Sequence, residues 1–289
     1  MQRFAMEVAM KDSLFLLFLY QTVPGRMLLK GLVQPKVSRL AGRYLASGAS
    51  RWLVPYYIRK HDIDMSDIVI PDEGFTSFNA FFTRKRAEIV HDFSRNHLLS
   101  PCDGYLKYVK IKKNKMYAIK HTAFSLEDLL QDERLAERFR DGAALIFRLT
   151  PANYHRYCYA ADGRSLSIRK IAGRLHCVRP VALRRFPVFV QNCREYEVME
   201  TEAFGTVVQM EIGALLVGKI NNHNTTAQAQ RVYAGDEKGY FEFGGSTIVI
   251  LLQKDAAHFP AKLYRSKNED GEIAVRKGET VAKKKRPAI

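Results

Sequence analysis

The chain reads Lys238-Gly-Tyr-Phe-Glu-Phe-Gly-Gly-Ser-Thr247 and then Ile248-Val-Ile-Leu-Leu252, and this stretch decides how the rest is organised. The run 248–252 is short, rich in β-branched residues and free of glycine and proline, so it predicts a buried strand. Gly244 and Gly245 place the hydroxyl of Ser246 at the start of that strand. Because Gly245 has no Cβ, the peptide before Ser246 can adopt strained dihedral angles that other residues cannot reach.

A strained peptide beside a positioned hydroxyl can rearrange. The Ser246 oxygen can attack the Gly245 carbonyl and convert the amide to an ester. β-Elimination would then cut the chain, leaving a dehydroalanine that loses ammonia and becomes a pyruvoyl group at position 246. The same tetrapeptide is also typical of a plain turn before a strand, so other stretches have to decide between the two interpretations.

Size and charge limit the classes of protein. The chain has 289 residues, enough to bury a full core, and 46 Lys plus Arg against 30 Asp plus Glu give a net charge of +16. This excess predicts an anionic partner, either nucleic acid or an acidic membrane surface. The four cysteines show no zinc spacing and suit reduced thiols in a cytoplasmic protein. There is no phosphate-binding glycine loop, which argues against a nucleotide enzyme.

Residues 1–70 are predicted to form a helical region that associates with membranes. Leu14 to Tyr20 is very apolar but shorter than the roughly 20 residues needed to span a bilayer. Pro24-Gly25 breaks the segment into shorter helices. Apolar residues interspersed with lysine and arginine are typical of an interfacial anchor. Packing of the same helices on the protein's own core is the alternative.

Residues 71–289 are predicted to form a β-rich catalytic domain. Ala143 to Thr150 reads as a buried strand, and short strands with glycine bends dominate from about residue 98 onward. Phe78, Phe81 and Phe82 form one helical stripe that indicates core packing. Residues 270–278 resemble a hairpin. The predicted fold class is α+β, with a predominantly antiparallel β core behind the N-terminal helices.

Three residues outside the Gly-Gly-Ser stretch can take part in proton transfer. Asp103 lies in the turn of Ser100-Pro-Cys-Asp-Gly104, and His155 follows the strand that ends before Pro151. His176 is a second histidine in the β region. Histidine titrates near neutral pH and is therefore the natural general base, although a lone histidine is more often structural.

Several stretches together resemble the phosphatidylserine decarboxylase family. They occur in the family's order and span nearly the whole chain. The matching stretches are Thr22-Val-Pro-Gly-Arg26, Ser77-Phe-Asn-Ala-Phe-Phe-Thr-Arg-Lys85, Ser100-Pro-Cys-Asp-Gly104, Tyr154-His-Arg156, Gly213-Ala-Leu-Leu-Val-Gly218, Glu237-Lys-Gly239 and Gly245-Ser-Thr247.

The resemblance implies a lyase made as a self-cleaving proenzyme. Autocatalytic cleavage between Gly245 and Ser246 would give a β chain, residues 1–245, and an α chain, residues 246–289, that stay bound. Ser246 would become a pyruvoyl group that forms a Schiff base with phosphatidylserine and releases CO2 and phosphatidylethanolamine, a step of phospholipid biosynthesis. This chemistry needs no metal and no pyridoxal phosphate.

The resemblance also implies a charge-relay set of Asp103, His155 and Ser246. The carboxylate would orient the imidazole, and the imidazole would take the serine proton. Many family members read His-Arg-x-His, whereas here the second histidine is replaced by Cys158. His155 is the histidine left in the motif and is assigned as the base, with His176 as the alternative.

The expected partner is phosphatidylserine in an anionic membrane, not nucleic acid. Peripheral attachment to the cytoplasmic side of the cell membrane follows, because basic residues near such a surface each contribute about 1 kcal/mol. By analogy with the family, the cleaved pair would dimerise. The alternatives are a decarboxylase of a related serine-headed lipid and, from a different class, a basic membrane- or nucleic-acid-binding module.

Overall fold

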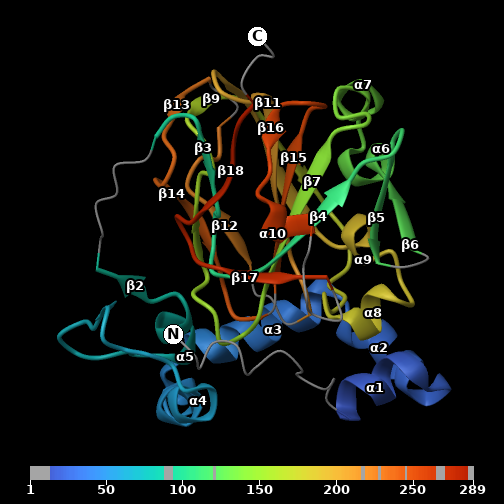
Figure 1. Cartoon of the computed structure of the whole chain (residues 1–289). Helices are drawn as coiled ribbons and strands as arrows, with labels where there is room; N and C mark the ends of the chain where they lie inside the picture. Colours follow the sequence, from blue (N-terminus) through green and yellow to red (C-terminus); the bar gives the residue numbers. More distant parts are fainter. Residues whose placement is uncertain are drawn as a thin grey trace.

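A computed structural model describes residues 14–87, 94–119, 122–215, 219–226, 229–244, 246–264 and 271–285. N-terminal helices form a layer below a core of antiparallel sheets (Figure 1). The predicted α+β class, with helices first and a predominantly antiparallel β core after them, is confirmed. The helices are α1 (Leu14–Gln21), α2 (Val23–Leu32), α3 (Pro35–Ala46), α4 (Leu53–His61), α5 (Phe78–Phe82), α6 (Leu126–Leu130), α7 (Glu133–Glu137), α8 (Pro180–Leu183), α9 (Val188–Gln191) and α10 (Ala261–Tyr264).

The largest sheet has the order β13-β9-β10-β11-β15-β7-β4-β17, and each neighbouring pair is antiparallel. Its strands are β13 (Arg231–Val232), β9 (Gly163–Ile171), β10 (Arg194–Thr201), β11 (Gly205–Ile212), β15 (Ser246–Leu252), β7 (Ala143–Leu149), β4 (Gly104–Lys110) and β17 (Ile273–Val275). The predicted strands at 248–252 and 143–150 are thus confirmed. Each residue of β15 is buried, which explains its continuous apolar pattern.

Smaller sheets complete the core. One has the order β12-β14-β8 and another β16-β18-β3, while β1-β2 and β5-β6 each form a separate two-stranded sheet. Their strands are β12 (Ile220–Asn222), β14 (Glu237–Phe241), β8 (Arg156–Cys158), β16 (Ala257–His258), β18 (Thr280–Lys284), β3 (His97–Leu99), β1 (Ile68–Val69), β2 (Lys85–Arg86), β5 (Lys115–Ile119) and β6 (Thr122–Ser125). The prediction of a hairpin at 270–278 is wrong. The strand in this segment, β17, pairs with β4, and the next strand, β18, pairs with β3.

The break between α1 and α2 follows from local chemistry. The Thr22 side chain caps α2 by accepting a hydrogen bond from the Gly25 amide at 3.0 Å, and Pro24 fits the first turn. Gly25 lies so close to α1 that a Cβ there would meet the carbonyl oxygen of Phe18 at 1.9 Å. The predicted break at Pro24-Gly25 is therefore confirmed, and Gly25 also permits the close packing of the two helices.

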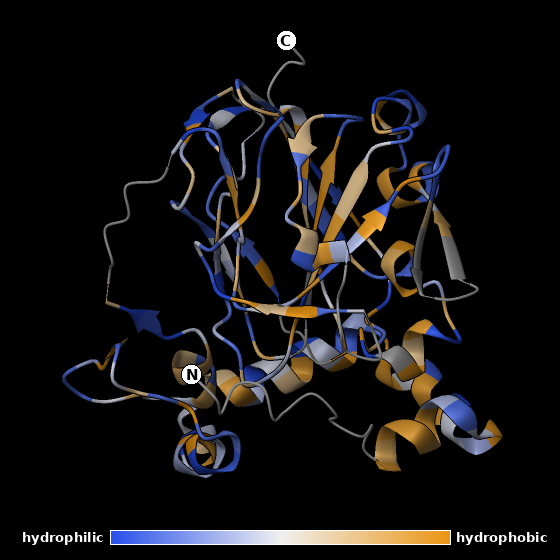
Figure 2. Cartoon of the chain, in the orientation of Figure 1, coloured by the Kyte–Doolittle hydropathy of each residue, from blue (hydrophilic) through white to orange (hydrophobic). Residues whose placement is uncertain are grey.

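The helical layer has two different faces. Leu19, Tyr20, Leu29 and Val33 are buried in the main core. The opposite face leaves large apolar side chains exposed. The ribbon of the lower helices contains many hydrophobic residues, coloured orange in Figure 2. The exposed apolar side chains are Leu14, Phe15, Phe18, Val23, Met27, Leu28, Leu40, Tyr44, Trp52 and Tyr56. Among the described helices, none has the length and apolarity required to cross a membrane.

The close contact at Gly25 predicts a specific instability. Gly25→Ala should lower the free energy of unfolding by about 1–3 kcal/mol, because backbone atoms of α1 would have to move. Gly31→Ala is the matched control in the same helix: a Cβ added there would meet no atom within 4 Å, so it should gain about 0.5 kcal/mol from helix propensity. Urea unfolding of both variants measures the difference, and equal midpoints would contradict the packing assigned to Gly25.

Candidate active site

Ser246 opens the central strand of the largest sheet. It pairs with Leu149, the last residue of β7, and its side chain is buried. Its Oγ has no hydrogen-bond partner among the described residues, and a buried hydroxyl without a partner calls for an explanation such as a catalytic role. Gly244 has a φ of +141°, a conformation that L side chains rarely adopt. Gly245, the other half of the predicted cleavage site, lies outside the described residues.

Asp103 lies at the same end of the sheet as Ser246. Asp103 directly precedes β4. Tyr105 of β4 pairs with Arg148 of β7, and Ser246 of β15 pairs with the next residue of β7, Leu149. The strands β4 and β15 therefore begin on either side of the end of β7. Two strand spacings correspond to about 10 Å. The carboxylate of Asp103 accepts hydrogen bonds from Arg86 Nη1 at 2.7 Å and from the Lys277 amide at 2.9 Å.

His155 lies beside the segment that leads to Ser246. Its ring is buried and stacks on Phe82 at 4.0 Å between centroids. Its carbonyl accepts a hydrogen bond from the Phe241 amide at 3.0 Å. Nδ1 lies 2.8 Å from the Asn153 carbonyl, so Nδ1 carries the proton in the neutral ring. Nε2 makes no hydrogen bond among the described residues, and in this tautomer it carries the lone pair.

Burial keeps the His155 ring uncharged. It lowers the pKa of His155 to about 3, and the charge of Arg84 acts in the same direction. The carbonyls of Asn153 and Gly244 act in the opposite direction on this pKa. The influence of Gly244 places the ring next to the predicted cleavage site. His155 is thus neutral throughout the physiological pH range.

The structure places His155 against the segment that leads to Ser246, but no described contact joins the ring to Ser246 Oγ or to Asp103. The described hydrogen bond of the imidazole is to Asn153, and the Asp103 carboxylate is occupied by Arg86 and Lys277. The charge-relay set thus stays a prediction from the resemblance.

Cys158 takes the place of the second histidine of many family members. Its amide donates to the Pro101 carbonyl at 2.9 Å, and its Sγ lies 3.8 Å from the Ser100 carbonyl. The side chain therefore lies against the segment that carries Asp103. Burial raises the pKa of the Cys158 thiol to about 12, so this thiol stays protonated and cannot replace histidine as a base at neutral pH.

The alternative base, His176, belongs to different surroundings. Its buried ring stacks on Phe186 at 4.7 Å and lies 6.2 Å from the ring of Tyr20 in α1. Neither ring nitrogen has a partner among the described residues. Burial lowers the pKa of His176 to about 4. The ring contacts of His176 thus come from the helical layer and from Phe186.

The helix α5 contributes to the site in a way that the sequence analysis missed. From the sequence alone, its phenylalanine stripe predicts core packing. In the structure Phe243, two residues before Gly245, packs on Phe78 and Phe82 at 5.1 Å each. The Phe243 amide also donates to Asn79 Oδ1 at 3.3 Å. The helix therefore holds both His155 and the segment before Ser246, and the signal was the repeated phenylalanine within a family motif.

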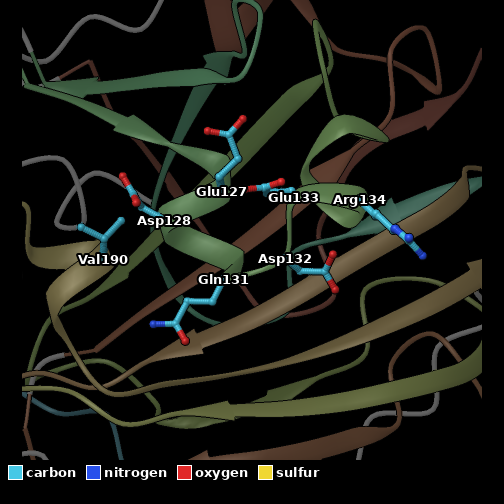
Figure 3. A pocket seen from close by; sticks show the side chains of 7 residues that line it. All are labelled: Glu127, Asp128, Gln131, Asp132, Glu133, Arg134 and Val190. Atoms are coloured by element: carbon cyan, nitrogen blue, oxygen red, sulfur yellow. The ribbon is translucent and has the colours of Figure 1, made fainter.

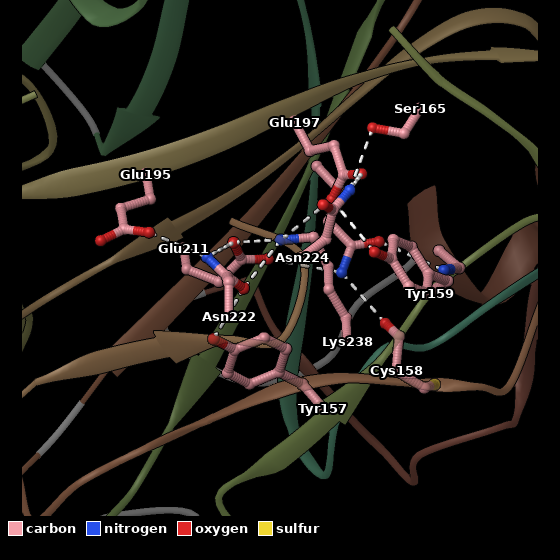
Figure 4. Close-up of polar contacts among 12 residues, drawn as sticks. Tyr157, Cys158, Tyr159, Ser165, Glu195, Glu197, Glu211, Asn222, Asn224 and Lys238 are labelled. Carbon is pink, nitrogen blue, oxygen red and sulfur yellow. Dashed lines mark hydrogen bonds and ion pairs between the residues drawn. The ribbon is translucent and has the colours of Figure 1, made fainter. Parts of the chain in front are cut away.

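A buried polar cluster was also missed (Figure 4). Lys238, 1 % exposed, donates to Glu211 Oε2 at 2.6 Å and to Asn222 Oδ1 at 2.9 Å, and lies 3.6 Å from Glu197. Burial raises the pKa of the Glu211 carboxyl, and Lys238 opposes this shift. Glu211 pairs with Ile248, two residues after Ser246, so its side chain lies on the same sheet face as Ser246. Through Lys238, the cluster thus connects β14 to the face of the large sheet on which Ser246 lies.

A surface hollow lies between α6, α7 and α9 (Figure 3). It is lined by Glu127, Asp128, Gln131, Asp132, Glu133, Arg134 and Val190. Its carboxylates fan out rather than converge, and Asp132 caps α7 by accepting from the Leu135 amide at 2.9 Å. Within the described ranges, no group of three His, Cys, Asp or Glu side chains could hold a metal ion.

Comparison with known proteins identifies the class and then the family. The model of the family described as phosphatidylserine decarboxylase matches residues 78–283. The phosphatidylserine decarboxylase proenzyme 2 of Clostridium acetobutylicum is 40 % identical over 268 residues, covering 91 % of this chain and 90 % of that protein. The proenzyme of Ruminiclostridium cellulolyticum is 39 % identical, with 91 % and 89 % coverage. That of Chlamydia muridarum is 37 % identical, with 86 % and 83 % coverage.

The protein is therefore an enzyme of the carboxy-lyase class. The chain belongs to the phosphatidylserine decarboxylase family. The predicted family and enzyme class are confirmed, and a basic module whose glycine turns are only structural is set aside.

The Lys238 cluster gives a test of how the site is held. Lys238→Met should lower the free energy of unfolding by about 3–5 kcal/mol, because Glu197 and Glu211 would be left buried without their cation. Lys262→Met is the control, since its ion pair with Glu279 is exposed and should be worth less than about 1 kcal/mol. Thermal and urea unfolding measure both variants, and equal losses would show that the buried pair is not required.

Proposed function

We propose that the chain cuts itself between Gly245 and Ser246 and, once cut, decarboxylates phosphatidylserine to phosphatidylethanolamine and CO2. The observation that carries the proposal is the buried, unpartnered hydroxyl of Ser246 at the end of a segment, 241–244, that contacts the neutral His155. Membership of a family whose named relatives are proenzymes supports self-processing. Decarboxylation of a related serine-headed lipid remains the alternative substrate choice.

The cleavage needs a nucleophile, a base and a leaving group. His155 Nε2 takes the proton of Ser246 Oγ as the oxygen attacks the Gly245 carbonyl carbon. The Gly245–Ser246 amide bond breaks, an ester bond forms, and the proton passes to the freed nitrogen. Loss of the residue 246 Cα proton and cleavage of its Cβ–O bond then release a carboxylate on Gly245. Hydrolysis of the resulting dehydroalanine, through its imine tautomer, expels ammonia and leaves the pyruvoyl ketone.

The residues at the start of β15 fit such a group. A serine whose Oγ makes no described hydrogen bond can lose that oxygen without breaking a contact of the fold. When present, the ketone withdraws the electrons of the breaking carboxylate bond. Phe82 and Phe243 exclude water from one side, and His155 can return a proton to the reacting carbon. We assign Asp103 to orientation of the site through Arg86, in addition to the charge-relay role that the resemblance implies.

The sheet topology supports an α chain, residues 246–289, that stays bound to the β chain, residues 1–245. After cleavage β15 would still lie between β11 and β7. β17 would pair with β4, and β18 with β3. These pairings would hold together the two pieces of the β-rich domain, residues 71–289, that lie on either side of the cleavage site. A dimer of the cleaved pair is proposed by analogy with the family alone.

The exposed apolar face of the helical layer supports peripheral attachment to the cytoplasmic side of an anionic membrane. Apolar side chains on α1 to α4 are exposed together with basic ones. Apolar insertion and attraction to anionic lipid add in such helices. The exposed basic residues include Lys30, Lys36, Arg39, Arg43, Arg59 and Lys60. The proposed membrane-associating region, residues 1–70, would deliver the lipid headgroup to Ser246.

Self-cleavage predicts two products. Wild-type protein should give fragments 1–245 and 246–289 on a denaturing gel, with the smaller one blocked at its N-terminus and matched by intact mass. Ser246→Ala should remain whole because the nucleophile is missing. His155→Ala should also remain whole, whereas His176→Ala, its matched control, should be cut. Cleavage of His155→Ala together with failure of His176→Ala would transfer the role of base to His176.

Membrane attachment predicts a position-dependent effect of apolar substitutions. The triple variant Leu14→Ser/Met27→Ser/Leu40→Ser should bind vesicles rich in anionic lipid at least ~10-fold more weakly, since each side chain would bury apolar area in the interface. Leu166→Ser/Tyr233→Ser removes exposed apolar groups from the β core and is the control. Vesicle sedimentation measures binding, and an equal loss in both variants would count against attachment through the helices.

A further inference from the structure

Arg84 is a buried cation that the described residues leave almost unsatisfied. It is 4 % exposed and stacks over Phe81 at 4.8 Å. Its Nη1 is 3.4 Å from the Phe81 carbonyl, and its Nε has no partner. No carboxylate in the described part of the chain forms an ion pair with it. Burying such a charge is costly unless it is paired.

Two other deeply buried cations of the chain are fully engaged. The Arg194 guanidinium donates to the carbonyls of Leu129, Val190, Asn192 and Asp128 at 2.8–3.0 Å. Lys238 is held by Glu211 and Asn222. The poor pairing of Arg84 is therefore not a general property of buried cations in this fold, and it calls for a ligand that brings the missing acceptors.

The surroundings of Arg84 contain a second unused donor. The Tyr57 hydroxyl has no described partner, and its ring lies 6.2 Å from that of Phe81, the ring under Arg84. Burial keeps the Tyr57 phenol protonated by raising its pKa, against the charge of Arg84. Asp103, the carboxylate whose charge acts on the pKa of Arg84, is already bound by Arg86. A guanidinium and a phenol with free hydrogen atoms match an oxyanion.

The location connects the membrane side of the molecule with Ser246. Tyr57 belongs to α4, where its neighbour Tyr56 and nearby Trp52 are exposed in the helical layer. Arg84 follows α5, whose Phe82 carries His155 and contacts Phe243. A lipid headgroup that passes from the helical layer to Ser246 would meet these side chains.

We propose that Arg84, assisted by Tyr57, is the anion subsite that holds an oxyanion of the lipid headgroup beside residue 246. The inference rests on the proposed function, because that function supplies a substrate with two such groups, a phosphodiester and a carboxylate. Either group satisfies the guanidinium. The subsite contributes to substrate binding, whereas residue 246 and His155 act on the bond that reacts.

The test compares Arg84→Gln and Arg84→Lys with wild type on phosphatidylserine in mixed micelles. In Arg84→Gln the KM should rise about 10- to 100-fold, the loss expected for a charge-assisted hydrogen bond, while kcat changes less. Arg84→Lys should recover part of the affinity. Arg164→Gln removes the same charge from an exposed position of β9, away from the helical layer, and should leave the KM within about twofold. An unchanged KM in Arg84→Gln would overturn the proposal.

Inhibition by soluble headgroups distinguishes the two oxyanions. Glycerophosphoethanolamine has the phosphodiester alone, and glycerophosphoserine has both groups. Weaker inhibition of Arg84→Gln by both compounds assigns the subsite to the phosphate, and weaker inhibition by glycerophosphoserine alone assigns it to the carboxylate. Unaltered inhibition by both compounds argues against the subsite. A shift of the pH profile with unaltered KM would instead make Arg84 a positioning residue for His155, and would also overturn the proposal.

Binding and stability measurements keep the test independent of self-cleavage. If Arg84→Gln is not cut, calorimetry should show that Ser246→Ala binds glycerophosphoserine and that Ser246→Ala/Arg84→Gln does not; equal binding overturns the subsite. Arg84→Gln should unfold at the same or higher urea concentration than wild type, because an unpaired charge is removed. A clear loss of stability with unaltered ligand binding would show a structural role. An uncut, inert wild type that still binds the headgroup through Arg84 would refute the proposed function and leave the subsite standing.

Discussion

The pairing of β15 with both β7 and β11 is the constraint on which the site depends. It fixes Ser246 at the head of a strand that is buried along its whole length. Every other part of the site is positioned against that point: Asp103 through β4, His155 through the segment after β7, and the Lys238 cluster through β11. The side chains there are buried, so polar atoms without hydrogen-bond partners are energetically expensive. Those of Ser246, His155 and Arg84 are therefore best understood as held ready for a reaction or a ligand.

Aromatic packing couples the helical layer to this strand. Tyr57, Phe78, Phe81, Phe82 and Phe243 form one cluster with contributions from α4, α5 and the segment before Ser246. The same rings carry His155 and Arg84. A change in the helical layer can thus reach the cleavage segment through contiguous side chains, without any movement of the large sheet.

Sequence patterns predicted where helices and strands lie better than they predicted which strands and side chains pair. The apolar run after Ser246 and the strand at 143–150 are long enough and apolar enough to be recognised as strands. Pro24-Gly25 marks a helix boundary because both residues act locally on the backbone. The pairing of β17 with β4 is a long-range choice that no local pattern encodes. Lys238 could not be recognised either, because a lysine in a strand normally faces water, and only the assembled sheets show that it meets two glutamates. For the site, motifs located Ser246, His155 and Asp103, whereas hydrogen bonds of Asp103 to Arg86 and Lys277 required coordinates.

The distribution of strands on either side of position 245 has a consequence for folding. The last part of the chain supplies the centre of one sheet and the partners of β4 and β3. While the polypeptide is continuous, these strands find their places in a unimolecular process. Two separated pieces would have to meet first, so recovery from denaturation would depend on protein concentration. Once processed, the enzyme would owe its persistence to slow unfolding rather than to ready renaturation.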